Sequence, residues 1–137
     1  MITPEELTNF MQQTFTGANY SVESVGEGHC TMIQQVGEEQ LRPGGTVSGP
    51  TLMGLADAAM YGAIIGSMGL NDTSIMSVTT SLNINFLRKP KAENGVKGVC
   101  DLIKVGKRLI IGEISLYSVG EESKPVAHVV ATYSVPG

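Results

Sequence analysis

The stretch from Arg42 to Leu70, RPGGTVSGPTLMGLADAAMYGAIIGSMGL, indicates how the rest of the chain is organised. A loop rich in glycine and proline leads into a long, almost wholly apolar segment that carries one acid, Asp57. Its apolar residues recur at i, i+3, i+4 and i+7, which predicts a helix. The reverse side of this helix is small or apolar as well, at Gly54, Ala58 and Gly62. We therefore expect the helix to be buried all round.

A carboxylate inside such a helix restricts what Asp57 can be. It must be paired, be hydrogen-bonded or hold its proton, because an isolated buried charge costs more than the spare stability of a domain. Asp57 therefore has a structural partner or faces a functional site. Small residues at every fourth position, from Gly54 to Gly66, predict close packing. They fit the curved sheet, a second copy of the helix, or simply a tight core.

The composition is that of one soluble globular domain spanning residues 1–137, with 42% hydrophobic and 16% charged residues. The absence of Trp, the 5% aromatic content and the net charge of −4 argue against a nucleic-acid partner. Most of the basic residues nevertheless gather in one window: Arg88, Lys89, Lys91, Lys97, Lys104, Lys107 and Arg108. That window suits a small polyanion such as a nucleotide tail, or it is a solvated edge that discourages strand aggregation.

The chain shows no sign of export, of a membrane span or of a metal site. Cys30 and Cys100 are too few and too far apart in sequence for a disulfide framework or a metal site, and we expect buried, reduced thiols. The first ten residues lack the features of a secretory signal. Asp57 and the glycines of the apolar helix make a membrane span a poor interpretation. We therefore expect a cytoplasmic protein without membrane, metal or cofactor.

The chain order indicates an α+β fold. Thr3 to Glu6 reads as a helix start with a capping box, and the central helix is capped by Ser48. Hydrophobic alternation predicts the strands at residues 20–27, 30–36, 74–88, 95–105, 108–118 and 126–135. Strand 74–88 is the most regular, with Thr79 and Asn83 on the side opposite a buried apolar face. Together these elements predict an antiparallel sheet wrapped around one helix.

The chemistry available to this chain is limited. His29 and His128 are the only histidines, both in strand patterns, and no G-x-S-x-G elbow is present. Backbone N–H groups at the start of the central helix, near Gly49, lack intrahelical partners and suit an oxyanion. One carboxylate with such a donor fits thioester hydrolysis, because a thiolate leaves with little proton donation.

Three segments carry a resemblance to a known family. The run from Gly49 through Leu55-Ala56-Asp57, the strand end Asn83-Ile84-Asn85-Phe86-Leu87-Arg88, and Gly106-Lys107-Arg108 resemble the PaaI-type acyl-CoA thioesterases of the hotdog fold. The resemblance covers roughly Arg42 to the C-terminus. It implies a curved antiparallel sheet around one long central helix, homodimers that pair their sheets and assemble to homotetramers, and active sites shared across the dimer interface.

The resemblance also implies roles for individual residues. Asp57 matches the catalytic nucleophile or general base, Gly49 the backbone donor that polarises the thioester carbonyl, and Thr79 a water-orienting hydroxyl supplied by the neighbouring subunit. The segments that meet the coenzyme A thioester contain the remaining candidates: Arg42, Ser48, Asn83, Arg88, Lys89, Lys107 and Arg108.

Two departures from the family pattern bear on activity. The usual His-Gly-Gly before the helix reads Ser48-Gly49-Pro50, and the upstream Asn or Gln is Arg42. Arg42 binds an anionic group on the ligand in one interpretation and is a solvated loop cation in the other. A non-catalytic acyl-CoA sensor is therefore the competing hypothesis, and a structural dimer without a ligand is the third. Ser48 without a base is a helix cap rather than a nucleophile.

Overall fold

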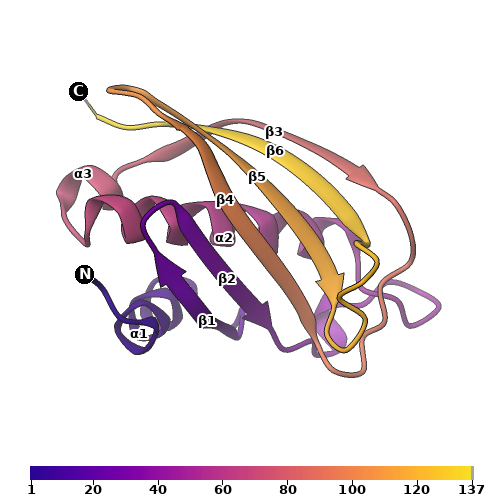
Figure 1. Ribbon diagram of the computed structural model, residues 1–137. Coiled ribbons are helices and arrows are strands. Elements are labelled where there is room, and N and C mark those ends of the chain that lie inside the picture. Colours follow the sequence, from indigo (N-terminus) through magenta and orange to yellow (C-terminus); the bar gives the residue numbers. More distant parts are fainter. Residues whose placement is uncertain (137) are drawn as a thin grey trace.

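The computed structural model describes residues 1–136 as one antiparallel sheet curved over one long helix (Figure 1). The sheet has six strands in the order β1-β2-β4-β5-β6-β3. The elements, in chain order, are α1 (Pro4–Thr14), β1 (Tyr20–Gly26), β2 (His29–Gln34), η1 (Glu38–Gln40), α2 (Gly49–Met68), α3 (Asp72–Ile75), β3 (Val78–Phe86), β4 (Val96–Val105), β5 (Leu109–Ser118) and β6 (Ala127–Ser134). This is the α+β hotdog arrangement expected from the sequence.

Helix α2 begins and ends where its sequence dictates. The Ser48 hydroxyl accepts a hydrogen bond from the Thr51 N–H at 3.3 Å, and Pro50 occupies the first turn. Gly69 ends the helix at a φ of 81°, which favours glycine. Thr3 and Glu6 form the predicted capping box of α1.

The small residues of α2 accept the sheet. A Cβ on Gly62 would lie 2.6 Å from the Sγ of Cys30, and one on Gly66 would collide with β1. Among the three alternatives for this strip, close packing against β1 and β2 is confirmed. Any larger residue at Gly62 would push the sheet away from the helix.

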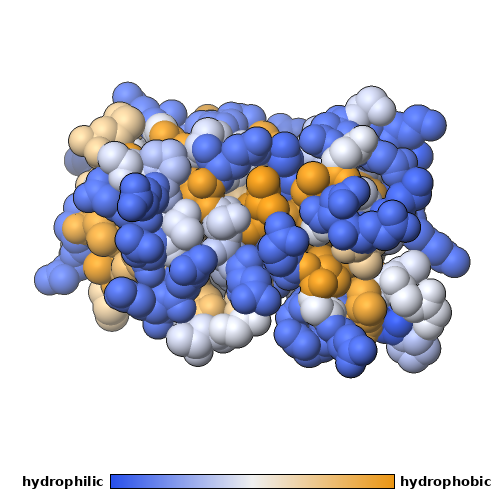
Figure 2. Space-filling model, turned by 90° about the horizontal axis from the view of Figure 1, so that it is seen from below, coloured by the Kyte–Doolittle hydropathy of each residue, from blue (hydrophilic) through white to orange (hydrophobic). Residues whose placement is uncertain are grey.

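Helix α2 is the core of the domain. Of the described helices it alone is long and apolar enough to cross a membrane, and 67% of its most apolar window is buried inside the domain. Figure 2 shows the molecule from below, with apolar side chains exposed near the middle of this face and polar side chains around them. Met53, at 40% exposure, shows that the first half of α2 is less covered than expected.

Strand β3 differs from its prediction in length and in burial. Asn71 caps the short helix α3, so the strand starts at Val78 instead of residue 74. The expected buried face is only partly covered: Leu82 and Ile84 pack against the core, but Val78 and Phe86 are 59% and 55% exposed. β3 is an edge strand, bonded only to β6, and a register shift after Thr79 takes Val78 off the face that Phe86 shares with the core residues. Alternation identifies residues that share a face, but it does not say whether the same chain covers that face.

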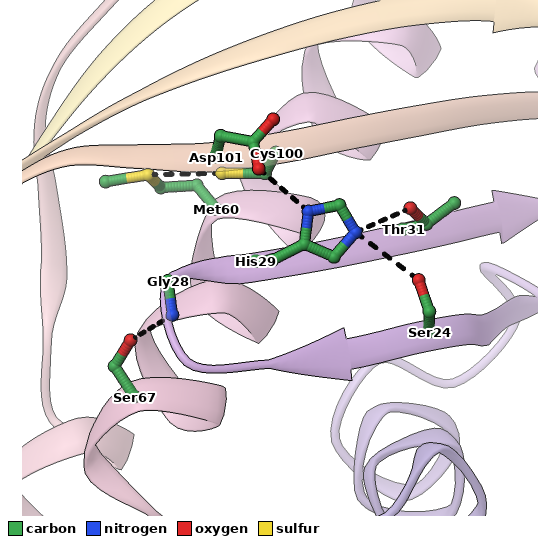
Figure 3. A network of polar contacts seen from close by, with 8 residues as sticks. All are labelled: Ser24, Gly28, His29, Thr31, Met60, Ser67, Cys100 and Asp101. Carbon is green, nitrogen blue, oxygen red and sulfur yellow. Dashed lines mark hydrogen bonds and ion pairs between the residues drawn. The ribbon is translucent and has the colours of Figure 1, made fainter.

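The two cysteines are neighbours in space. Cys30 on β2 and Cys100 on β4 are cross-strand partners, although 70 positions separate them in the sequence. Both are free and buried, as expected, and burial raises the pKa of the Cys30 thiol to about 12. The Cys100 thiol points to the Sδ of Met60 on α2, 3.9 Å away (Figure 3).

Candidate active site

Asp57 lies in the middle of α2, and two hydroxyl groups hold one of its oxygens. The Oγ1 of Thr79 donates to Oδ1 at 2.7 Å, and the hydroxyl of Tyr133 donates to the same oxygen at 2.6 Å. The Tyr133 hydroxyl also lies 3.1 Å from the Asp57 carbonyl oxygen. Asp57 is half-buried and none of the cations in residues 1–136 forms an ion pair with it. It is therefore a hydrogen-bonded acid at a surface.

Thr79 reaches Asp57 because of an irregularity in β3. The pairing of β3 with β6 shifts register between Thr79 and Ser81, which marks a β-bulge. A bulge re-aims a side chain, and here Thr79 turns to the helix side of the sheet. Two expectations are corrected: Thr79 does not share a face with Asn83, and its hydroxyl meets the Asp57 of its own chain rather than that of a neighbour.

Asp57 opens onto a cavity of about 540 Å³. The cavity wall is mainly apolar and aromatic and comes from α1, β1, α2, α3, β3 and β6. Its lining residues are Thr14, Phe15, Tyr20, Gly54, Asp57, Ala58, Tyr61, Ile75, Ser77, Val78, Thr79 and Tyr133. We call this the Asp57 cavity. It can hold an apolar group beside one carboxylate.

Aromatic rings form most of the bulk of that wall. Phe15 packs edge-on against Tyr20 and Tyr61, with ring centroids 6.3 and 6.1 Å apart, and Tyr61 stacks on Tyr133 at 6.4 Å. Phe10 contacts Tyr61 from the outer side at 6.2 Å. Such pairs add stability beyond the area that they bury, so the wall is a firm surface.

The environment keeps the tyrosines protonated. Burial raises the pKa of Tyr133, and the negative charge of Asp57 together with their hydrogen bond raises it further. Burial raises the pKa of Tyr20 first and the charge of Asp57 second. Tyr133 therefore remains a hydrogen-bond donor to Asp57 throughout the neutral and mildly alkaline range.

A second cavity, of about 430 Å³, lies at the start of α2. It contains the Gly49 backbone and three cations, and we call it the Gly49 cavity. Its lining residues are Arg42, Thr46, Val47, Gly49, Leu52, Phe86, Leu87, Arg88, Lys89 and Pro90. Gly49 precedes Asp57 by eight residues, which is about 12 Å along a helix axis. One small carbonyl group cannot contact both residues of the same chain.

The other predicted residues fall in three places. Arg42, Arg88 and Lys89 line the Gly49 cavity, with the Nε of Arg88 donating to the Pro125 carbonyl at 2.9 Å. Ser48 caps α2. Asn83 lies between Leu82 and Ile84, which pack against the core, so it faces the opposite side of the sheet from α2.

Lys107 and Arg108 lie at the other end of the sheet from the Gly49 cavity. Leu109 and Val78 both pair with Ser134, whereas Phe86 pairs with Ala127 at the far end of β6. The length of β3, about 27 Å for eight steps, separates the two ends. A single chain therefore does not bring these two cations to Arg88 and Lys89.

Tyr133 is the functional candidate that sequence reasoning missed. It shares the inward face of β6 with Ala131 and Val129, so the sequence pattern indicates only that Tyr133 is a core residue. The hydroxyl of a buried tyrosine needs a hydrogen-bond partner, and this requirement was the only indication in the sequence that Tyr133 contacts a polar group. The partner, 76 positions away, follows only from the fold.

His29 has satisfied hydrogen bonds on the other side of the sheet from α2. Its Nδ1 lies 2.8 Å from the Oδ1 of Asp101, and its Nε2 lies 3.2 Å from Thr31 and 3.4 Å from Ser24 (Figure 3). His128 likewise pairs with Glu113 at 2.7 Å. None of these residues lines the two cavities. Both histidines are partly exposed and hydrogen-bonded, and neither contacts Asp57.

The fold and the placement of Asp57 define the class as a hotdog domain with an acid on its central helix. Comparison with known families gives the affiliation: the sequence model of the Thioesterase superfamily matches residues 44–124. The chain belongs to this superfamily, in line with its resemblance to the PaaI-type hotdog thioesterases. No curated protein matches the chain.

Solved structures agree with this affiliation. A protein of Silicibacter sp. TM1040, provisionally described as a thioesterase, shares 34% identity over 100% of this chain and 94% of its own, with a TM-score of 0.88. A hypothetical thioesterase from Streptococcus pneumoniae, solved with coenzyme A, is 22% identical over 95% and 97% with a TM-score of 0.79. A mutant of the phenylacetic acid degradation protein PaaI from Thermus thermophilus is 22% identical over 92% and 97% with a TM-score of 0.73. The last two likenesses concern the fold alone.

Proposed function

We propose that this protein is a cytoplasmic acyl-CoA thioesterase in which Asp57 is the general base or nucleophile. One observation carries the proposal. Asp57 lies on the wall of an apolar cavity, and two donors bind its Oδ1. No donor in residues 1–136 binds its Oδ2. An acyl group placed in that cavity brings its thioester carbon towards the unoccupied oxygen.

The separation of the two cavities favours a site shared by two subunits. Asp57 needs a donor for the developing oxyanion, and Gly49 of the same chain is about 12 Å away along the helix, which is too far. Gly49 of the partner subunit is the better source. Each active site then uses Asp57 and Thr79 of one chain with the Gly49 N–H of the other.

The edge strand supports this assembly. β3 exposes apolar side chains at Val78, Phe86 and Leu87 and has one unpaired edge. If β3 pairs antiparallel with the partner's β3, its Val78 end lies beside the partner's Phe86 end. Phe86 borders the Gly49 cavity, so the pairing brings the two kinds of cavity together. We propose this homodimer as the active unit, with two dimers forming a homotetramer.

The reaction is then a hydrolysis with a good leaving group. Water deprotonated by Asp57, or the Asp57 carboxylate itself, attacks the thioester carbon, and the carbonyl oxygen takes the negative charge near the Gly49 N–H. The carbon–sulfur bond breaks and coenzyme A leaves as the thiolate, which takes up a proton. In the nucleophilic variant, water then cleaves the mixed anhydride and restores Asp57.

The cations provide for the coenzyme A moiety. Arg42, Arg88 and Lys89 border the Gly49 cavity. In the proposed dimer, Lys107 and Arg108 of the partner subunit approach the same region, because antiparallel pairing reverses the ends of the sheet. Coenzyme A bound to the Streptococcus pneumoniae relative is consistent with this assignment. Arg42 then binds an anionic group instead of positioning the thioester as an amide side chain would.

A panel of acyl-CoAs with short, long and aromatic acyl groups tests the function. Turnover of any member above the uncatalysed rate supports a thioesterase. A thermal shift with coenzyme A esters but no turnover favours the sensor, to which Arg42 and Pro50 point as replacements of the usual positioning groups. The absence of both a shift and turnover leaves a structural dimer.

A further inference from the structure

The hydrogen bonds to Asp57 come from two supports of different kinds. Thr79 lies on the edge strand β3, beside a bulge, and is exposed. Tyr133 lies on β6, which is hydrogen-bonded on both sides to β5 and β3, and is 4% exposed. Tyr133 is therefore the more firmly fixed of the two donors.

The ring of Tyr133 is itself held in place. It stacks on Tyr61 with ring centroids 6.4 Å apart and an angle of 27° between the planes. Its hydroxyl reaches both Oδ1 and the carbonyl oxygen of Asp57, at 2.6 and 3.1 Å. One side chain therefore contacts the acid at its backbone and at its carboxylate.

We propose that Tyr133 is a positioning residue that fixes the plane of the Asp57 carboxylate, so that Oδ2 faces the acyl group. This inference rests on the proposed function. With Oδ1 held by Thr79 and Tyr133, the carboxylate has no free rotation, and the oxygen left over is the reacting one. Buried beside Asp57, the Tyr133 phenol keeps its proton and remains a donor in the neutral range, because burial and the charge of Asp57 raise its pKa.

Tyr133→Phe removes the donor and keeps the ring. We expect kcat to fall about 10-fold to 100-fold, the scale of one hydrogen bond to a charged group. We expect KM to stay within about 2-fold, because the cavity wall is unchanged. A kcat within about 2-fold of the wild type, or a loss confined to KM, would overturn the proposal.

Tyr61→Phe is the matched comparison. The Tyr61 hydroxyl donates to the carbonyl oxygen of Ile75 at 2.7 Å, so its removal also breaks a short hydrogen bond of a buried tyrosine, but not one to Asp57. We expect the two variants to lose a similar amount of Tm, and Tyr61→Phe to lose several-fold less kcat. Equal losses of kcat would indicate a merely structural tyrosine.

A second readout does not depend on turnover. Crystal structures of the wild type and Tyr133→Phe should show the Asp57 carboxylate in one orientation in the former and rotated, or in two orientations, in the latter. The same orientation of the Asp57 carboxylate in both structures would contradict the positioning role of Tyr133. If the wild type hydrolyses no acyl-CoA, the proposed function fails, and the carboxylate orientation still decides whether Tyr133 positions Asp57.

Discussion

The two cavities along α2 differ in what they can do. The Asp57 cavity has a carboxylate, two hydroxyl donors and an aromatic wall, but no cation among its lining residues. The Gly49 cavity has the Gly49 N–H at the helix start and three cations, but no acid among its lining residues. The first suits an acyl group and the second suits a phosphate-bearing leaving group.

Under the proposed function, one chain therefore holds both the acid and the oxyanion donor but does not bring them together. A helix places residues eight positions apart about 12 Å from each other, and no side-chain movement closes that distance for a backbone N–H. The proposed dimer, paired through the exposed edge of β3, would join the two cavities. Each prediction below tests one half or the way in which they meet.

The largest effect is expected at the acid. Asp57→Asn removes the base or nucleophile while keeping the two hydrogen bonds to Oδ1, so kcat should fall about 10²-fold to 10⁴-fold. The measurement is steady-state hydrolysis of the best acyl-CoA of the panel. Thermal shift with the same ester should show that binding persists. Normal hydrolysis of every accepted acyl-CoA by the variant would remove Asp57 from the mechanism.

The amide at Gly49 is expected to matter nearly as much. Gly49→Pro removes the N–H at a helix position that proline favours, and kcat should fall about 10²-fold to 10³-fold, the scale of one oxyanion donor. Gly49→Ala keeps the N–H, and its Cβ would lie 3.4 Å from the Phe86 ring, so it is the control. Similar losses in both variants would point to crowding rather than to a missing donor.

The same two variants show whether the site is shared. In a mixed dimer of Asp57→Asn and Gly49→Pro, one site receives Gly49 and Asp57 from different chains and is intact, whereas the other has neither. Random co-assembly should restore about a quarter of the wild-type activity. If each site belonged to a single chain, mixing would restore none.

The cations should have a moderate effect that depends on the leaving group. Lys89→Ala is expected to raise KM for coenzyme A thioesters about 2-fold to 5-fold, as expected for one exposed charge pair, and less at high salt. Thioesters of N-acetylcysteamine lack the nucleotide and should show no such change. An equal rise in KM for both substrate types would place Lys89 at the acyl group instead.

The sequence predicted those parts of this molecule that depend on local rules. Apolar periodicity and the Ser48 cap predicted α2, and alternation predicted each strand to within a few residues. The requirement that an acid in an apolar helix be paired, be hydrogen-bonded or hold its proton is met at Asp57, which accepts hydrogen bonds from Thr79 and Tyr133. Such inferences need only neighbouring residues along the chain.

Other parts depended on contacts that the chain order does not reveal. The bulge beside Thr79 reversed the face of that residue, and Asn71 started a short helix where a strand was expected. Tyr133 and Asp57 meet only because β6 crosses the middle of α2. β3 also exposes apolar side chains. The sequence pattern alone does not show whether the same chain or a partner subunit covers them.

The smallest expected effect concerns Ser48, next to Gly49. Its hydroxyl accepts from the Thr51 N–H at 3.3 Å and lies 2.8 Å from the Thr51 hydroxyl, which is the geometry of a helix cap. Ser48→Ala should therefore cost about 1 kcal/mol of unfolding free energy. That corresponds to a fall in Tm of about 3 to 5 °C, measured by differential scanning calorimetry. A loss of kcat of about tenfold or more at an unchanged Tm would instead mean that the Ser48 hydroxyl takes part in the reaction. The Gly49 cavity would then contribute a side chain to the chemistry in addition to its backbone N–H and its cations.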